Sequence, residues 1–256
     1  MSTSPVPAMP SETAPLSEGA RIVNTFIAPS KTFADLRRKA SWWAPWLIIS
    51  LFTLIFIYTV DRQVGFDQIT QNEIAKSPKR AEQIEKLPAD QRANNLRIST
   101  TITRYASYAV PILALIGFLV IAVVLWATFS LAAGAAVPFS VALAIVIYGS
   151  LPSIFHALLA TVSLIAGSAS GALDKTAYNI QNPVATNPAY FMDPAGNKFV
   201  YGIASALDVF MLWTIVLIGI GFATNSKVKR GTAIGIVLGW YLLYKLMGAG
   251  FAAAFS

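Results

Sequence analysis

The stretch from Val110 to Leu151, VPILALIGFLVIAVVLWATFSLAAGAAVPFSVALAIVIYGSL, contains no charged residue. A helix that crosses the hydrocarbon core of a bilayer needs about 20 predominantly apolar residues. The stretch forms most of two such helices, and only the four residues from Gly134 to Val137 separate them. It therefore predicts a tight antiparallel hairpin of membrane-crossing helices.

Three further apolar runs flank this hairpin. The chain is predicted to be all-α, a polytopic transmembrane bundle within residues 42–256 whose five spans lie at about 43–60, 105–133, 138–167, 199–223 and 231–254. Only 12% of the residues are charged and the mean hydropathy is +0.60, whereas a soluble domain carries about 25% charged residues. Inside the third span, Pro152 removes a backbone hydrogen bond and predicts a kink.

The segments outside the spans are polar. Residues 1–20 are rich in Ser, Pro, Ala and Thr and predict a disordered tail without a secretory signal. Residues 61–104 and 168–198 are predicted to be outer loops, the first with short helices. The second contains Asn182-Pro183 and Asn187-Pro188 and is predicted to be extended and rich in turns.

Residues 21–41 form a cytoplasmic segment ahead of the first span. Ile22, Val23, Phe26 and Ile27 recur at helical spacing, and a basic cluster follows them. A helix that lies in the membrane interface would show this pattern. A cap that packs on the bundle would show it equally well, so both alternatives stay open.

Aromatic and basic residues predict the membrane boundary. Trp42, Trp43 and Trp46 suit the headgroup level as interface anchors. The amino-terminal side would hold eight bases and the other side ten, so counting alone favours the opposite orientation. The compact bases that adjoin span ends weigh most, so we expect a cytoplasmic amino terminus in the cell (inner) membrane. These bases are Arg37, Arg38, Lys39, Lys227, Lys229 and Arg230.

Three ionisable residues fall inside the predicted spans at similar depth, namely His156, Asp208 and Lys245. Such groups are costly in the bilayer and need partners. The favoured interpretation is a structural Asp208–Lys245 ion pair with His156 hydrogen-bonded nearby. The alternative is a polar centre for a proton, an ion or a lipid headgroup.

The fifth span carries Gly231, Gly235 and Gly239 at four-residue spacing. Small residues at this spacing let helix backbones approach closely. We expect this stripe to pack within the chain, and a dimer face is the alternative.

No catalytic or metal-binding pattern is found. The chain has no cysteine and one histidine, and it lacks the phosphate-loop and H-E-x-x-H motifs. Ser170 lies several helical turns from His156, too far for a nucleophile and its base. The bases do not form a stripe with aromatics between them, which argues against nucleic acid and for membrane lipids as partners. The sequence predicts no enzyme and no cofactor.

Several segments resemble the Yip (Ypt/Rab-interacting protein) family of five-span membrane proteins, in its bacterial branch. They are Ile22 to Pro45, Tyr148 to Pro152, and Leu207 to Phe210 with Trp213. The resemblance implies five helices, a cytoplasmic amino terminus and no enzymatic activity. Eukaryotic members act with small GTPases in vesicle trafficking, but their Asp-Leu-Tyr-Gly-Pro signature is not found here, so GTPase binding is not carried over.

The leading functional hypothesis is a non-enzymatic integral membrane scaffold or organising protein. It would act through contacts with lipids, with other membrane proteins or with a second copy. The alternative is a small-solute or lipid transporter that uses the intramembrane Asp, Lys and His residues.

Overall fold

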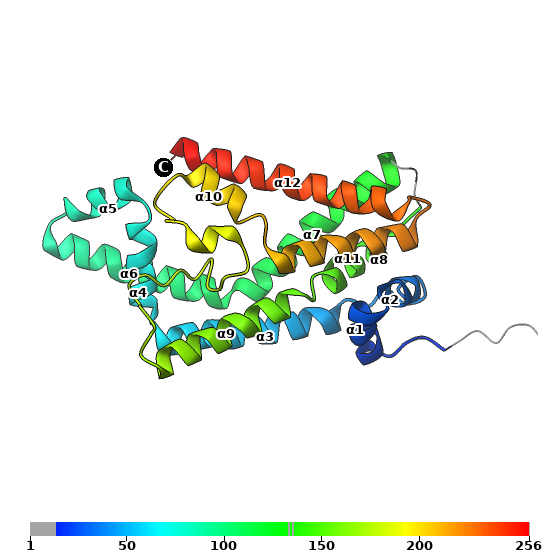
Figure 1. Cartoon of the computed structure of the whole chain (residues 1–256), viewed down its shortest axis with the longest axis horizontal. Coiled ribbons are helices and arrows are strands. Elements are labelled where there is room, and N and C mark those ends of the chain that lie inside the picture. Colours follow the sequence, from blue (N-terminus) through cyan, green and yellow to red (C-terminus); the bar gives the residue numbers. More distant parts are fainter. Residues whose placement is uncertain (1–13, 133, 135, 256) are drawn as a thin grey trace, which may run out of the picture.

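A computed structural model describes residues 14–132, 134 and 136–255. The described residues form helices, turns and loops without strands, so the all-α prediction is confirmed. The helices are α1 (Glu18–Ile27), α2 (Pro29–Asp35), α3 (Trp43–Gln63), α4 (Phe66–Ala75), α5 (Pro78–Glu85), α6 (Ala89–Tyr108), α7 (Val110–Ala127), α8 (Phe139–Gly149), α9 (Ser153–Ala169), α10 (Lys198–Ala204), α11 (Val209–Asn225) and α12 (Arg230–Phe255) (Figure 1). A π-helical turn, η1 (Thr128–Ala132), extends α7, and a short 3-10 helix, η2 (Pro188–Phe191), lies in the α9–α10 loop.

Four helical segments in the described part of the chain are long and apolar enough to cross a membrane. They are Trp43–Gln63, Val110–Leu131, Phe139–Ala169 and Arg230–Ala252. The fourth predicted span, about residues 199–223, is not one straight helix. It consists of α10 and α11, whose axes differ by 57° at a break before Val209. If this bent pair counts as one span, the candidate spans number five.

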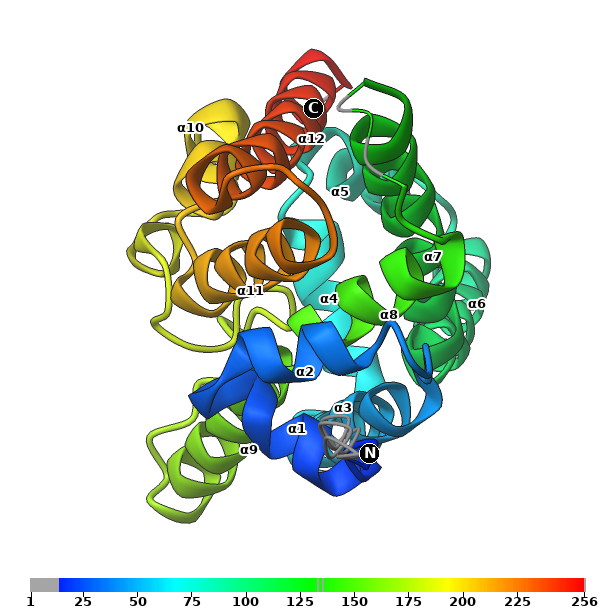
Figure 2. The same cartoon turned by 90° about the vertical axis from the view of Figure 1, so that its right-hand side faces the viewer.

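Helix α8 lies at the centre of the bundle. It contains no charged residue, and the side chains from Ala144 to Tyr148 are 0% exposed. A helix that is apolar all round is stable when it is covered on every side. Figure 2 views the bundle from the end that carries α1 and α2, and α8 lies between α3, α7 and α11. The third span is interrupted at residues 150–152, where Pro152 precedes α9.

A second apolar cluster joins α3, α4 and α9 near the opposite end. Val60 and Phe66 are almost fully buried there, together with Leu164. The chain turns from α3 into α4 at Gly65, whose φ of +87° is a backbone conformation that side-chain-bearing residues rarely adopt. This turn lets α4 fold back against the bundle, while α5 and α6 extend beyond it (Figure 1).

The amino-terminal segment packs on the bundle. Of the predicted disordered tail, residues 1–13 lie outside the described residues. Its last residues, Glu18 to Ala20, belong to α1. Phe33 and Leu36 are 0% exposed in the main core. Of the two alternatives for residues 21–41, the packed cap matches these contacts, although Val23 and Ile27 stay exposed.

Candidate functional site

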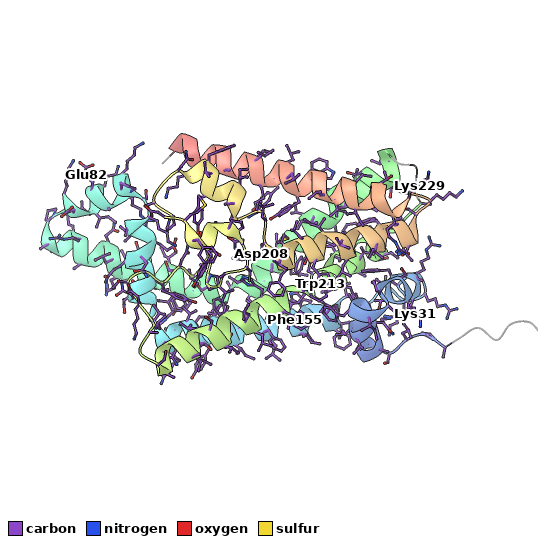
Figure 3. All side chains as sticks on the ribbon, viewed as in Figure 1. Lys31, Glu82, Phe155, Asp208, Trp213 and Lys229 are labelled. Carbon is purple, nitrogen blue, oxygen red and sulfur yellow. The ribbon has the colours of Figure 1, made fainter. Side chains whose placement is uncertain are left out.

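His156, Asp208 and Lys245 border one cavity of about 360 Å³. His156 belongs to α9, Asp208 directly precedes α11 and Lys245 lies on α12. Further polar lining comes from α10 and its C-cap, from α12 and from the loop between α9 and α10, including Asn182, Asn187, Tyr201, Ser205 and Tyr241. Figure 3 labels Asp208 between the two ends of the bundle, which are marked by Lys229 and Glu82.

Asp208 ends the break between α10 and α11 as the N-cap of α11. Its Oδ1 accepts hydrogen bonds of 3.0 Å from the backbone N–H groups of Phe210 and Met211. The Thr186 hydroxyl donates to Oδ2, and the Val209 N–H donates to the Thr186 carbonyl at 3.1 Å. A carboxylate at a helix N-terminus satisfies free amides and is favoured by the helix dipole. Asp208 thus stabilises the start of α11 and holds the loop against it.

Lys245 has neutral neighbours. Its Nζ donates to Ser205 Oγ over a long 3.4 Å and lies 5.8 Å from the centre of the Tyr241 ring. The described residues form no Asp208–Lys245 ion pair, so that expectation is wrong. The reason is the break in the fourth span. Because of this break, Asp208 is the N-cap of α11, and its carboxylate accepts hydrogen bonds from two backbone amides and from the Thr186 hydroxyl.

His156 is half-buried, and its ring meets the Phe210 ring edge-on with 5.9 Å between the centroids. The hydrogen bonds of the described residues do not involve its ring nitrogens. The Asp208 carboxylate acts electrostatically on both His156 and Lys245. The cavity therefore holds two opposite charges and a histidine, none of them paired with another.

The sequence interpretation missed the role of the loop. Asn182 and Asn187 hydrogen-bond each other reciprocally at 2.9 and 3.3 Å, and the Asn179 amide donates to Tyr201 Oη at 3.0 Å. Val184 and Ala189 are buried, so the loop folds into the bundle instead of lying outside it. The repeated Asn-Pro pairs indicated only turns. Asp208 directly before an apolar run was the available signal for a helix start.

Two further hollows adjoin the cavity. One of about 490 Å³ shares Tyr201, Ser205 and Lys245 with it and reaches Glu73 and Lys76 on the α4 side. The other, of about 420 Å³, lies under the loop beside Tyr178. Burial raises the pKa of the Tyr178 phenol, so this group stays protonated. The polar space therefore continues from Lys245 towards the end that carries α4 and α5.

The glycine stripe of α12 does not pack within the chain. At Gly231, Gly235 and Gly239 no described atom lies within 4 Å of the position that a Cβ would take. The expected intrachain role is therefore wrong. Close helix approach occurs instead at Gly219 of α11, where a Cβ would lie 2.7 Å from the Ile234 Cα.

The predicted interface anchors gather at one end of the bundle. The Trp46 indole donates to the Pro111 carbonyl at 3.2 Å and joins α3 to α7, and Trp43 is 52% exposed. Arg37 donates to Asn225 Oδ1 at 3.0 Å, which brings its basic cluster beside the α11–α12 turn. Arg38 and Lys39 are exposed next to it, and Trp42 contacts Trp46 edge-on.

Comparison with known protein families shows that residues 23–251 match the Yip1 domain. Nothing among curated proteins or solved structures matches the chain. The matched residues run from the cap through α12 and include the whole cavity. The chain is therefore a membrane protein that belongs to the Yip family, defined by its Yip1 domain.

Proposed function

We propose that this chain is a non-enzymatic organising protein of the cell (inner) membrane, with its amino terminus in the cytoplasm. It acts through contacts with lipids and with other membrane proteins. The observation that supports this proposal is the concentration of bases at the end formed by the cap and the α11–α12 turn, which we call the basic end.

The basic end carries cations with few acids around them. Its bases are Lys31, Arg37, Arg38, Lys39, Lys227, Lys229 and Arg230. The acids of α1 and α2, Glu18 and Asp35, are both paired with the buried Arg21. Figure 3 shows Lys31 and Lys229 at this end and Glu82 at the other. Each base near an anionic leaflet contributes about 1 kcal/mol of attraction.

The sides of the bundle offer apolar contact surface. Helix α7 exposes Ile112, Ile116 and Val120, and α12 exposes Tyr244 and Met247. Acyl chains or helices of other membrane proteins can pack on these faces. This surface supports an organising role that needs no chemistry.

Orientation is tested in the natural chain background, because it contains no cysteine. Ala34→Cys on α2 and Ala93→Cys on α6 place one thiol on an exposed position at each end. With a membrane-impermeant maleimide on intact spheroplasts, we expect labelling of Ala93→Cys, and of Ala34→Cys only after permeabilisation. The reverse pattern would overturn the proposed orientation.

The organising role is tested by crosslinking and affinity purification from native membranes. We expect a membrane protein partner in stoichiometric amount. Recovery of a bare monomer with bound lipid or solute would contradict this role and favour the second candidate.

The second candidate is a small-solute or lipid transporter. The observation that favours it is the broken fourth span beside a polar cavity, since transporters place their sites at discontinuous helices. Ser205→Cys in the cavity and Ser50→Cys, which is buried on α3 away from it, form a matched pair. Labelling of Ser205→Cys alone by a small water-soluble thiol reagent supports a water path. If Ser205→Cys is not labelled, a water path to the cavity is excluded.

A further inference from the structure

The cavity contains opposite charges that do not neutralise each other. Asp208 and Lys245 both line it, yet each hydrogen-bonds only to neutral groups of the described residues. An unpaired charge inside a membrane protein is costly. A bound molecule that brings both missing partners would remove this cost on both sides.

The free hydrogen-bonding capacity shows which partner each side needs. The Lys245 ammonium has three N–H donors, and one of them is used, over a long distance. It can donate hydrogen bonds to the oxygens of a phosphate or a carboxylate. Asp208 accepts three hydrogen bonds, and a carboxylate offers about four lone-pair sites. One site remains for a cationic donor, and no cation of the described residues pairs with the charge.

From this arrangement we propose that the cavity binds a zwitterion, a molecule that carries a primary ammonium and an anionic group. The anionic group lies at Lys245 and the ammonium at Asp208. The headgroup of an aminophospholipid such as phosphatidylethanolamine has this chemistry, and so does free phosphoethanolamine. The cavity volume of about 360 Å³ suits a small polar group, since ligand sites span about 300–1,000 Å³.

A singly charged ligand fits less well. A simple anion would pair Lys245 and leave Asp208 without a cation, and a simple cation would do the reverse. The lipid form has further support from the adjoining hollow of about 490 Å³, which is lined by Lys245 together with Tyr244 and Phe251. These two side chains are 71% and 67% exposed on α12, where acyl chains would surround them.

The inference deepens the second candidate function, because it names the ligand of the same cavity. Binding is nevertheless measured without transport. If Ser205→Cys is not labelled, the water path that transport needs is excluded, but a lipid can still bind in the cavity. An absence of zwitterion binding would sink the inference and leave the thiol labelling result unaffected.

Binding is measured with the full chain in detergent by native mass spectrometry. The probes are phosphatidylethanolamine, phosphatidylglycerol and phosphatidylcholine with identical acyl chains, and free phosphoethanolamine as competitor. Phosphatidylglycerol lacks the ammonium, and phosphatidylcholine has no N–H to donate. We expect phosphatidylethanolamine to bind most tightly, with Kd raised about tenfold by Asp208→Asn or by Lys245→Gln, and rescue by Lys245→Arg.

The variants are chosen to keep the fold. Asn caps a helix about as well as Asp, so Asp208→Asn removes charge and retains the cap. Asp193→Asn and Lys86→Gln make the same changes at exposed positions and should alter Kd less than about twofold. Lys245→Gln, which touches no cap, decides the question if Asp208→Asn lowers the Tm.

Displacement of the lipid by phosphoethanolamine would support the proposal and show that the headgroup alone is enough for binding. Preference for phosphatidylethanolamine without displacement would support it with the lipid as the ligand. Equal binding of the three lipids, or unchanged affinity in both cavity variants, would overturn it.

Discussion

Two polar segments outside the spans differ in how they relate to the bundle. The cap, formed by α1 and α2, buries Arg21 and Phe33 and contacts α8, α9 and α11. The outer hairpin, formed by α5 and α6, buries only Ile84 among its described residues. Both segments are helical and rich in charge, so their composition does not separate them. The difference lies in burial: Arg21 and Asp35 of the cap pair with each other inside the core, whereas Arg104 of α6, which pairs with Asp61 of α3, is 53% exposed.

In the cap, the polar groups form one internal network. Arg21 Nη2 lies 2.7 Å from Asp35 Oδ2, and the hydroxyls of Thr25 and Thr32 both donate to the Arg21 carbonyl at 2.8 Å. The Tyr148 hydroxyl of α8 donates to Glu18 at 2.8 Å. Because these groups are satisfied internally, the cap can lie in the core without unpaired charge.

Aromatic rings add the apolar part of the cap contact. Phe26 of α1 meets Phe155 of α9 and Trp213 of α11 edge-on, and the latter two stack on each other with 5.7 Å between their centroids (Figure 3). The outer hairpin has charge pairs at its surface instead, such as Lys86–Glu82. The cap is therefore part of the core, while the outer hairpin lies at the surface and is joined to the bundle near the end of α6, where Arg104 lies 2.8 Å from Asp61 of α3.

The largest expected effect breaks the cap network. Arg21→Met leaves Asp35 buried without its cation and should destabilise the protein by about 3–5 kcal/mol, measured by unfolding in detergent. Arg97→Met on exposed α6 should change stability by less than about 0.5 kcal/mol. The double variant Arg21→Met/Asp35→Leu should recover much of the loss. Equal losses at Arg21 and Arg97 would abolish the distinction between the segments.

A second change tests how closely the cap approaches α11. At Gly221 a Cβ would lie 2.4 Å from Ile145 Cγ2 and 3.1 Å from the Phe33 ring. Gly221→Ala should therefore destabilise by about 1–3 kcal/mol through overpacking. Gly248→Ala on α12 has open space around it and should stabilise by up to about 1 kcal/mol. Thermal unfolding that shows the same sign for both variants would contradict this packing.

A third change isolates one hydrogen bond between cap and core. Tyr148→Phe removes the donor to the Glu18 carboxylate and should cost about 1–2 kcal/mol. Tyr105→Phe on α6, where the side chain is 71% exposed, is the control and should be nearly silent. Denaturant unfolding of both variants measures the difference, and an unchanged free energy of unfolding in Tyr148→Phe would show that this bond does not stabilise the cap.

The smallest effect concerns the outer hairpin itself. Lys86 and Glu82 are 73% and 64% exposed, so water and salt screen their 2.6 Å pair. Lys86→Gln should shift stability by less than about 0.5 kcal/mol, and by less still in 1 M salt. A loss above about 1 kcal/mol would show that the outer hairpin is docked on the bundle more firmly than its exposure indicates.

The sequence predicted the helices better than their contacts. A span such as residues 110–131 is recognised from its length of about 20 apolar residues alone. The pairing of Arg21 with Asp35 depends on the turn between α1 and α2, and the burial of Phe33 depends on α11, almost 190 residues later. Such distant contacts leave no periodic signal in one sequence.

The cavity shows the same limit. Hydropathy identified His156, Asp208 and Lys245 as costly residues, and they do line one cavity. The predicted partner of Asp208, Lys245, was wrong because hydropathy cannot distinguish a straight span from two helices that meet at a cap. The loop residues, Thr186 above all, escaped because a polar loop is ordinarily expected in water.

The attachment of the cap to α11 sets an order for biogenesis. Asn225 Nδ2 donates to the Phe33 carbonyl across 192 positions of chain. At about 5–20 residues per second, roughly 10–40 s separate the synthesis of the two partners. During that interval α8 and α9 are available to the cap, but its α11 partner is missing, so the contacts that cover Phe33 from α11 cannot form. Completion of α11 is thus the step that lets the cap reach its full set of contacts.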